Sequence, residues 1–161
     1  MVSKIIILGA IVAIVVGAIG YVYFGVVSPA AEKPVIEKPA LLEGQNVDTE
    51  HIRWLANELG AYKIHSSLSS EEAQIEIVVE GVPFAVTNGE GGPIASDGKA
   101  ENPDIRITAG RASFGELMAA QNIKSKIVEL YDSGKIGVEL LKDQAALALK
   151  GYKSIYDQIN G

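Results

Sequence analysis

The apolar side chains divide the chain into one uninterrupted run near its start and a longer region of periodic segments. Residues 5–27 contain no charged residue, Asn, Gln or Pro. As a helix, this run would be about 34 Å long, enough to cross a hydrocarbon core of about 30 Å. We therefore expect a transmembrane anchor helix over residues 1–27, which makes this a single-pass protein of the cell membrane. Cleavage as a signal peptide remains an alternative, because the small residues Ser28 and Ala30 follow the run.

Alternation of apolar and polar positions predicts strands in the second half of the chain. The period-two pattern is present at residues 75–80, 82–88, 105–108 and 134–140. A further short strand is expected around Ile94, between two turn-forming dipeptides. The sequence thus predicts four or five short strands.

Apolar residues spaced three and four apart predict helices between and after these strands. Residues 47–60 form one such segment, with Asp48 or Thr49 as its cap. Residues 113–116, Ser-Phe-Gly-Glu, have the form of a capping box and predict the start of a second helix. Asp143 is the expected cap of the last helical region.

Two further segments complete the helical pattern. Apolar residues at 123–131 predict a helix that ends near Gly134. The last helical region is expected to continue to residue 159, with Tyr152 on its apolar stripe. Helices and strands in this order indicate an α+β domain.

The order of strand, two helices, short strand and terminal helices resembles the sterol carrier protein 2 (SCP2-like) family. The resemblance covers residues 48–160 and is carried by PDIRITAGRASFGELM at 103–118 and SGKIGVELLKDQAALALKGYKSIYDQI at 133–159. It implies a curved, mainly antiparallel sheet of about five strands covered by helices. It also implies an apolar tunnel for a lipid, sterol or acyl chain, with no catalytic residues, metal or cofactor.

The resemblance also implies which residues line the tunnel. Transferred by position, the lipid-binding residues are apolar side chains on the matching strands and helices: Phe84, Ile105, Ile107, Phe114, Leu117, Met118, Ile127, Leu130, Leu149, Tyr152, Ile155 and Tyr156. The alternative is that most of them are simply core, because a domain of this size needs nearly all its large apolar side chains to close its interior. Met118 has a flexible side chain that suits a variable ligand.

A proline-rich segment joins the anchor to the domain. Prolines recur every five residues within 28–46, which predicts an extended, semi-rigid linker before an SCP2-like domain at 47–161. Trp54, the only tryptophan, is expected at the edge of the core, at a pocket mouth or on a partner surface.

Composition excludes several functions. The chain after the anchor run contains 20 acidic and 13 basic residues, which gives it a net charge of about −7. This negative charge disfavours nucleic acid as a partner. The chain has no cysteine, and its two histidines, His51 and His65, lack zinc-ligand spacing. No Gly-x-Ser-x-Gly or phosphate-loop motif is present. We expect a binding protein without metal or cofactor rather than an enzyme.

Two functions fit these patterns. The first is a membrane-anchored SCP2-like domain that binds a lipid or other apolar molecule. The second is an accessory subunit of a membrane complex with a closed pocket, in which Gly9, Ala13 and Gly17 pack on partner helices. The domain is expected on the extracytoplasmic side, because Lys4 lies closer to the apolar run than Lys33 does.

Overall fold

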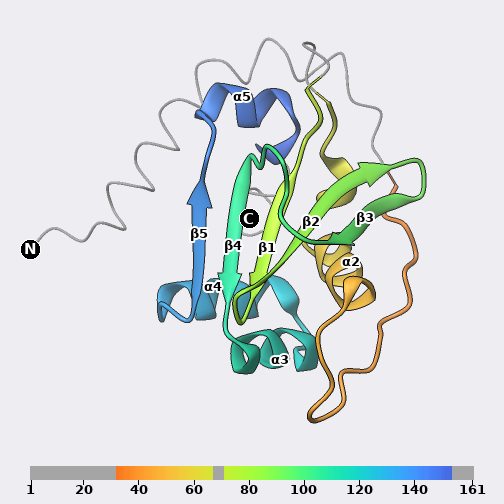
Figure 1. Ribbon diagram of the computed structural model, residues 1–161, viewed down its shortest axis with the longest axis vertical. Helices are drawn as coiled ribbons and strands as arrows, with labels where there is room; N and C mark the ends of the chain where they lie inside the picture. Colours follow the sequence, from red (N-terminus) through yellow and green to blue (C-terminus); the bar gives the residue numbers. More distant parts are fainter. Residues whose placement is uncertain (1–31, 67–70, 154–161) are drawn as a thin grey trace, which may run out of the picture. The chain divides into compact units, whose positions relative to one another are not determined.

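The computed structural model describes residues 32–66 and 71–153 (Figure 1). The predicted anchor at 1–27, with its three helix-contact positions, lies outside these ranges, as do Ile155 and Tyr156. Within the described residues, no helix has the length and apolar character needed to cross a membrane. The anchor and these two tunnel positions therefore remain predictions from the sequence.

A five-stranded sheet forms the centre of the domain (Figure 1). Its strands are β1 (Ile75–Val79), β2 (Val82–Gly89), β3 (Gly92–Asp97), β4 (Ile105–Ala109) and β5 (Ile136–Leu140). They lie in the order β3-β2-β1-β4-β5, so that β3 and β5 form the two edges. All the predicted strands are present, and together with the helices they confirm the α+β class.

The sheet is mixed. The β1–β2, β2–β3 and β4–β5 pairs are antiparallel, whereas β1 and β4 run parallel, with Ile75 opposite Ile105 and Ile77 opposite Ile107. Side chains alternate between the two faces, so these isoleucines share the face that the helices cover. The parallel pair needs a long crossover, which β2 and β3 supply.

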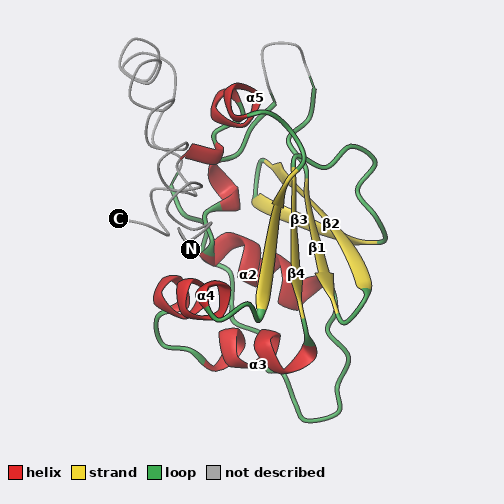
Figure 2. Ribbon diagram, turned by 90° about the vertical axis from the view of Figure 1, so that its left-hand side faces the viewer, coloured by secondary structure: helices red, strands yellow, loops and turns green. Residues whose placement is uncertain are grey.

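Helices lie on one face of this sheet (Figure 2). They are α2 (Thr49–Glu58), the short 3-10 helix η1 (Ala61–Lys63), α3 (Arg111–Ala119), α4 (Ile123–Asp132) and α5 (Gln144–Leu149). Their buried apolar residues join those of the strands in one continuous core. The predicted arrangement of helices over a sheet is therefore present.

Two of the predicted helix caps are confirmed and one is wrong. The Asp48 side chain accepts hydrogen bonds at the start of α2, and Asp143 accepts one from the amide of Ala146. The capping box at Ser113 does not form: the cap of α3 is Gly110, three residues earlier, which offers no side chain. Ser113 is buried inside the helix instead.

The last predicted helical region is interrupted at Gly151, and its residues 154–159 lie outside the described residues. Helix α5 ends at Leu149, and Gly151 follows with a positive φ of 85°. A Cβ at Gly151 would lie 2.6 Å from the carbonyl oxygen of Lys63, so only glycine fits this close approach. The turn directs Tyr152 into the core instead of continuing one straight helix.

Residues 33–46, which we call the arm, run along the domain. Asn57 on α2 donates to the carbonyl of Pro34 (3.0 Å), and His51 Nε2 lies 3.2 Å from the carbonyl oxygen of Ala40. The compact unit that contains the sheet begins with the arm rather than after it. The sequence predicted a linker up to residue 46, whereas the structure includes this stretch in the domain.

Candidate apolar binding site

Most of the described residues predicted to line a tunnel are packed in the core. Eight of them are buried: Phe84, Ile105, Phe114, Leu117, Met118, Ile127, Leu130 and Tyr152. Ile107 is partly buried, and Leu149 is 49% exposed on α5, which places it at the surface rather than in the interior. Close packing of this kind is what the core interpretation of these residues predicts.

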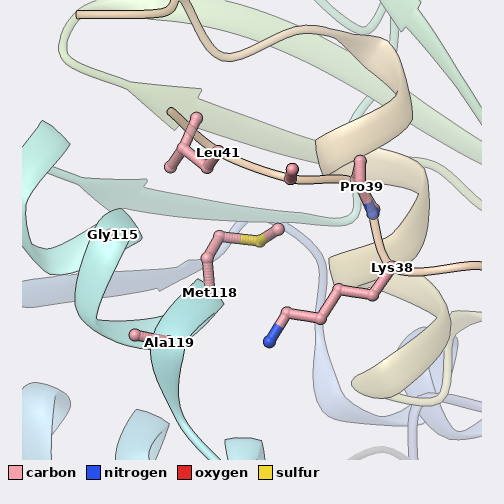
Figure 3. A pocket seen from close by; sticks show the side chains of 7 residues that line it. Lys38, Pro39, Leu41, Gly115, Met118 and Ala119 are labelled. Carbon is pink, nitrogen blue, oxygen red and sulfur yellow. The ribbon is translucent and has the colours of Figure 1, made fainter. Parts of the chain in front are cut away.

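An open pocket lies between the arm and α3 (Figure 3). It encloses about 300 Å³ and is lined by four consecutive arm residues and one turn of α3: Lys38, Pro39, Ala40, Leu41, Gly115, Met118 and Ala119. This volume lies at the lower end of the range for ligand pockets, about 300–1,000 Å³. Met118 is the predicted binding residue that lines it, and its side chain points into the space between the two segments.

Gly115 keeps one wall of this pocket open. It lies in the interior of α3, where glycine destabilises a helix by about 0.5–1 kcal/mol relative to alanine. A Cβ at this position would meet no atom within 4 Å, and its φ is not positive. Neither close packing nor backbone geometry therefore requires glycine here.

Lys38 supplies a positive charge beside the pocket. Its Nζ lies 4.9 Å from the centre of the Trp54 ring, and its side chain extends toward α3 (Figure 3). Trp54 itself is only 6% exposed, so it belongs to the edge of the core, one of its predicted positions. An apolar wall beside a lysine suits an apolar chain that carries an anionic group.

A second surface hollow, of about 400 Å³, lies beside β3 and α2. Its lining includes three polar or charged residues, Thr49, Glu50 and Arg53, together with Ile94 and Ala95. The Arg53 guanidinium already donates to the carbonyl of Pro93 (3.0 Å). This hollow is a poorer place for an apolar molecule than the space beside α3.

Apolar side chains are also exposed on β5. Val138 is 42% and Leu140 46% exposed. They pair with Ile107 and Ile105 of β4 and therefore lie on the helix side of the sheet. Ile136, at the other end of the strand, is buried. The helices thus cover only one end of β5.

A buried polar cluster fastens the end of α5 to the sheet. Lys150 Nζ lies 2.7 Å from Asp104 Oδ1 and 3.2 Å from Glu71 Oε2, and the Tyr152 hydroxyl donates to Asp104 Oδ2 (2.9 Å). The Gln74 amide also donates to Asp104 Oδ2 (2.9 Å). Asp104 and Lys150 are 0% and 1% exposed, so this ion pair is shielded from solvent.

Ionisation in this cluster is shifted. Burial and the nearby Asp104 carboxylate raise the pKa of Tyr152. Burial lowers the pKa of Lys150, but its contacts with Asp104 and Glu71 outweigh burial and raise it overall. The hydrogen bond from Lys150 lowers the pKa of Glu71. All three shifts stabilise the charged pair and the neutral phenol at neutral pH.

His51 fastens the start of α2 to its cap and to the arm. His51 is buried; its Nδ1 lies 2.6 Å from Asp48 Oδ1, and its Nε2 contacts the arm. Burial raises the pKa of Asp48, yet its hydrogen bonds with His51 outweigh burial and lower it. Among the described residues, no group of three His, Asp or Glu side chains could hold a metal ion.

Two solved structures show a distant likeness to this chain. No family model and no curated protein matches the chain. One solved structure, titled "UbiJ-SCP2 Ubiquinone synthesis protein", has a TM-score of 0.40 and 14% identity, over 70% of this chain and 90% of that one. Another, the sec-alkylsulfatase Pisa1 from Pseudomonas sp., has a TM-score of 0.36 and 14% identity, over 58% of this chain and 14% of that one. Similarities this low assign neither activity nor ligand.

The pocket beside α3 combines a predicted and an unpredicted part. Met118 was among the predicted binding residues, but the arm was expected to be a spacer and Gly115 was not singled out. The available signal was a glycine inside an otherwise good helical pattern, which often has a packing or functional reason. No local pattern indicates that a proline-rich segment docks beside it.

Proposed function

We propose that this chain is a membrane-tethered domain that binds a lipid or other apolar molecule. The observation that carries the proposal is the pocket beside α3, where Gly115 leaves space and Met118 supplies an adaptable wall. The sequence resemblance to SCP2-like proteins supports the same class of ligand. The sequence-predicted anchor at residues 5–27 would hold the pocket close to a bilayer, its source of ligand.

The pocket favours a slender amphiphile. Its volume of about 300 Å³ suits a single chain better than a bulky ligand. Lys38 would pair with an anionic head group, while Leu41, Met118 and Ala119 would contact the chain. A fatty acid is the simplest molecule with this chemistry.

Native mass spectrometry with lipid extraction tests this proposal. The fragment 32–161 keeps the arm and removes the anchor, whose bound lipids would mask the result. We expect near-stoichiometric co-purified lipid, or binding of added decanoate to the lipid-free fragment. A clean ligand-free mass together with no binding of decanoate would contradict the proposal.

Two substitutions at one position locate the site. Gly115→Ala adds a methyl group to open space, so we expect ligand binding to persist and the free energy of unfolding to rise by about 0.5–1 kcal/mol. Gly115→Leu also favours a helix, but its longer side chain fills the pocket, so binding should fall at least tenfold while folding is kept. Equal binding by both variants would place the ligand elsewhere.

A second function, a non-catalytic accessory subunit of a membrane complex, is favoured by the packed core and the exposed Val138 and Leu140. Exposed apolar residues next to one another are a feature of protein interaction surfaces. A domain that binds no lipid but co-purifies from membranes with a fixed partner would support this function.

A further inference from the structure

The outer edge of β5 has backbone groups available for pairing. Within the part of the chain that the structure describes, no strand pairs with this edge. The Leu141 amide donates to the carbonyl of Asp104 on β4. Since hydrogen-bonded residues alternate along an antiparallel strand, Ile136, Val138 and Leu140 turn their N–H and C=O groups outward.

Among the described residues, proline side chains protect the opposite edge of the sheet, whereas none protects the edge of β5. In β3, Pro93 has no N–H to offer, and the ring of Pro34 in the arm lies against Gly92. Strand β5 contains no proline, and its Glu139 is engaged by Arg106 of the same chain (2.9 Å). An edge without such protection is a template for another strand.

We propose that two copies of this chain associate through antiparallel pairing of their β5 strands, centred on Val138. In this register Val138 faces its own symmetry mate, and Ile136 of each copy faces Leu140 of the other. All outward backbone groups of the three residues then pair, giving about six hydrogen bonds. The exposed Val138 and Leu140 side chains gain apolar neighbours on the helix side of the joined sheets.

The charges on β5 disfavour one neighbouring register. With the two-fold axis at Val138, Glu139 lies opposite Gly137, so no like charges face each other directly. Moving the axis one residue, to Glu139, would set two carboxylates directly opposite each other, which is destabilising. Because β5 runs from Ile136 to Leu140, an axis at Val138 is the one that overlaps all five residues of both strands in a two-fold symmetric contact.

The predicted anchor makes such a small interface effective. A contact of five residues on each side is smaller than most stable interfaces between freely diffusing proteins. Anchors at residues 5–27 would confine both copies to one membrane plane, which raises their effective concentration. We therefore expect pairing of the full-length chain in membranes. This inference does not depend on ligand binding.

Cysteine crosslinking of the full-length chain in membranes tests the register. The protein has no cysteine, so Val138→Cys introduces a single thiol. Directly opposed hydrogen-bonded residues have Cα atoms about 5.5 Å apart, within disulfide range. With copper phenanthroline as oxidant, we expect a disulfide-linked dimer as the main product. Ile94→Cys, at a similarly exposed site on β3, is the control and should give at least fivefold less dimer.

A matched pair of charged variants provides the second measurement. Val138→Lys would oppose two ammonium groups at the axis, whereas Ile94→Lys leaves β5 unchanged. The dimer is measured by photo-induced crosslinking, which does not depend on amines. We expect Val138→Lys to give at least tenfold less crosslinked dimer than the wild type. Ile94→Lys should give the same amount of dimer as the wild type. If Val138→Cys crosslinks no better than Ile94→Cys, or Val138→Lys keeps the dimer, the proposed pairing is overturned.

Discussion

Lys150 and Asp104 form an ion pair from which solvent is excluded. Removing one partner of such a pair leaves a buried charge without compensation, which costs about 3–5 kcal/mol. We expect Lys150→Met to lower the free energy of unfolding by this amount, measured by urea denaturation. Lys124→Met, at an exposed lysine, is the control and should change stability by less than about 0.5 kcal/mol. A similar small effect for both variants would show that Lys150 is dispensable.

The same cluster predicts how stability responds to alkaline pH. The pKa values of Tyr152 and Lys150 are both raised in the folded protein, so above pH about 10 the unfolded chain releases protons that the folded chain retains. Stability should therefore be fully present below this pH and fall as the pH rises beyond it.

The measurement is the urea midpoint between pH 8 and pH 11. Tyr152→Phe removes the buried phenol and should make the decline at high pH shallower, although the variant is less stable at pH 8. Tyr131→Phe removes an exposed phenol and should follow the wild type. If the urea midpoint of Tyr152→Phe fell with pH in parallel with that of the wild type, ionisation of Tyr152 would not be a cause of the decline.

At the level of secondary structure, local patterns predicted most elements but not every boundary. Asp48 and Asp143 cap their helices as predicted, because each carboxylate accepts hydrogen bonds from backbone amides of the first turn. Ser113 matched the capping pattern equally well, yet burial of Phe114 and Leu117 moves the start of α3 to Arg111. Tertiary packing outweighed a local preference worth about 1 kcal/mol.

Contacts between distant segments explain what the sequence pattern missed. Alternation identified β1 and β4 as strands, but it contains no information that they pair in parallel. The prolines predicted an extended arm, yet its docking depends on Asn57, which is far along the chain. The pocket lies between such distant segments, so of its lining only Met118 was among the predicted binding residues.

The arm gives a prediction about this docking. Deleting residues 1–43 removes Lys38 from the face of Trp54 together with partly buried apolar side chains such as Ile36. We expect red-shifted fluorescence of the single tryptophan and a loss of about 1–3 kcal/mol in unfolding free energy. Deleting residues 1–31 leaves the arm intact and should change neither quantity. Identical behaviour of the two truncations would mean that the arm does not pack on the domain.

For the whole molecule, we expect the net charge and the predicted anchor to make opposite contributions to membrane association. The region after the anchor run carries 20 acidic and 13 basic residues, so anionic headgroups repel it at low ionic strength. The described part contains no helix that could span a bilayer. The sequence predicts that residues 5–27 would provide stable attachment, because a spanning helix would bury far more apolar surface than a single acyl chain does.

Sedimentation with anionic lipid vesicles separates the two contributions. We expect the full-length chain to pellet with reconstituted vesicles and to remain there after washing with alkaline carbonate. The fragment 32–161 should stay in the supernatant at both low and high salt, because screening removes repulsion without creating an anchor. Release of the full-length chain by carbonate would show that residues 5–27 do not span the membrane. Pelleting of the fragment would instead reveal a membrane-binding surface on the domain itself.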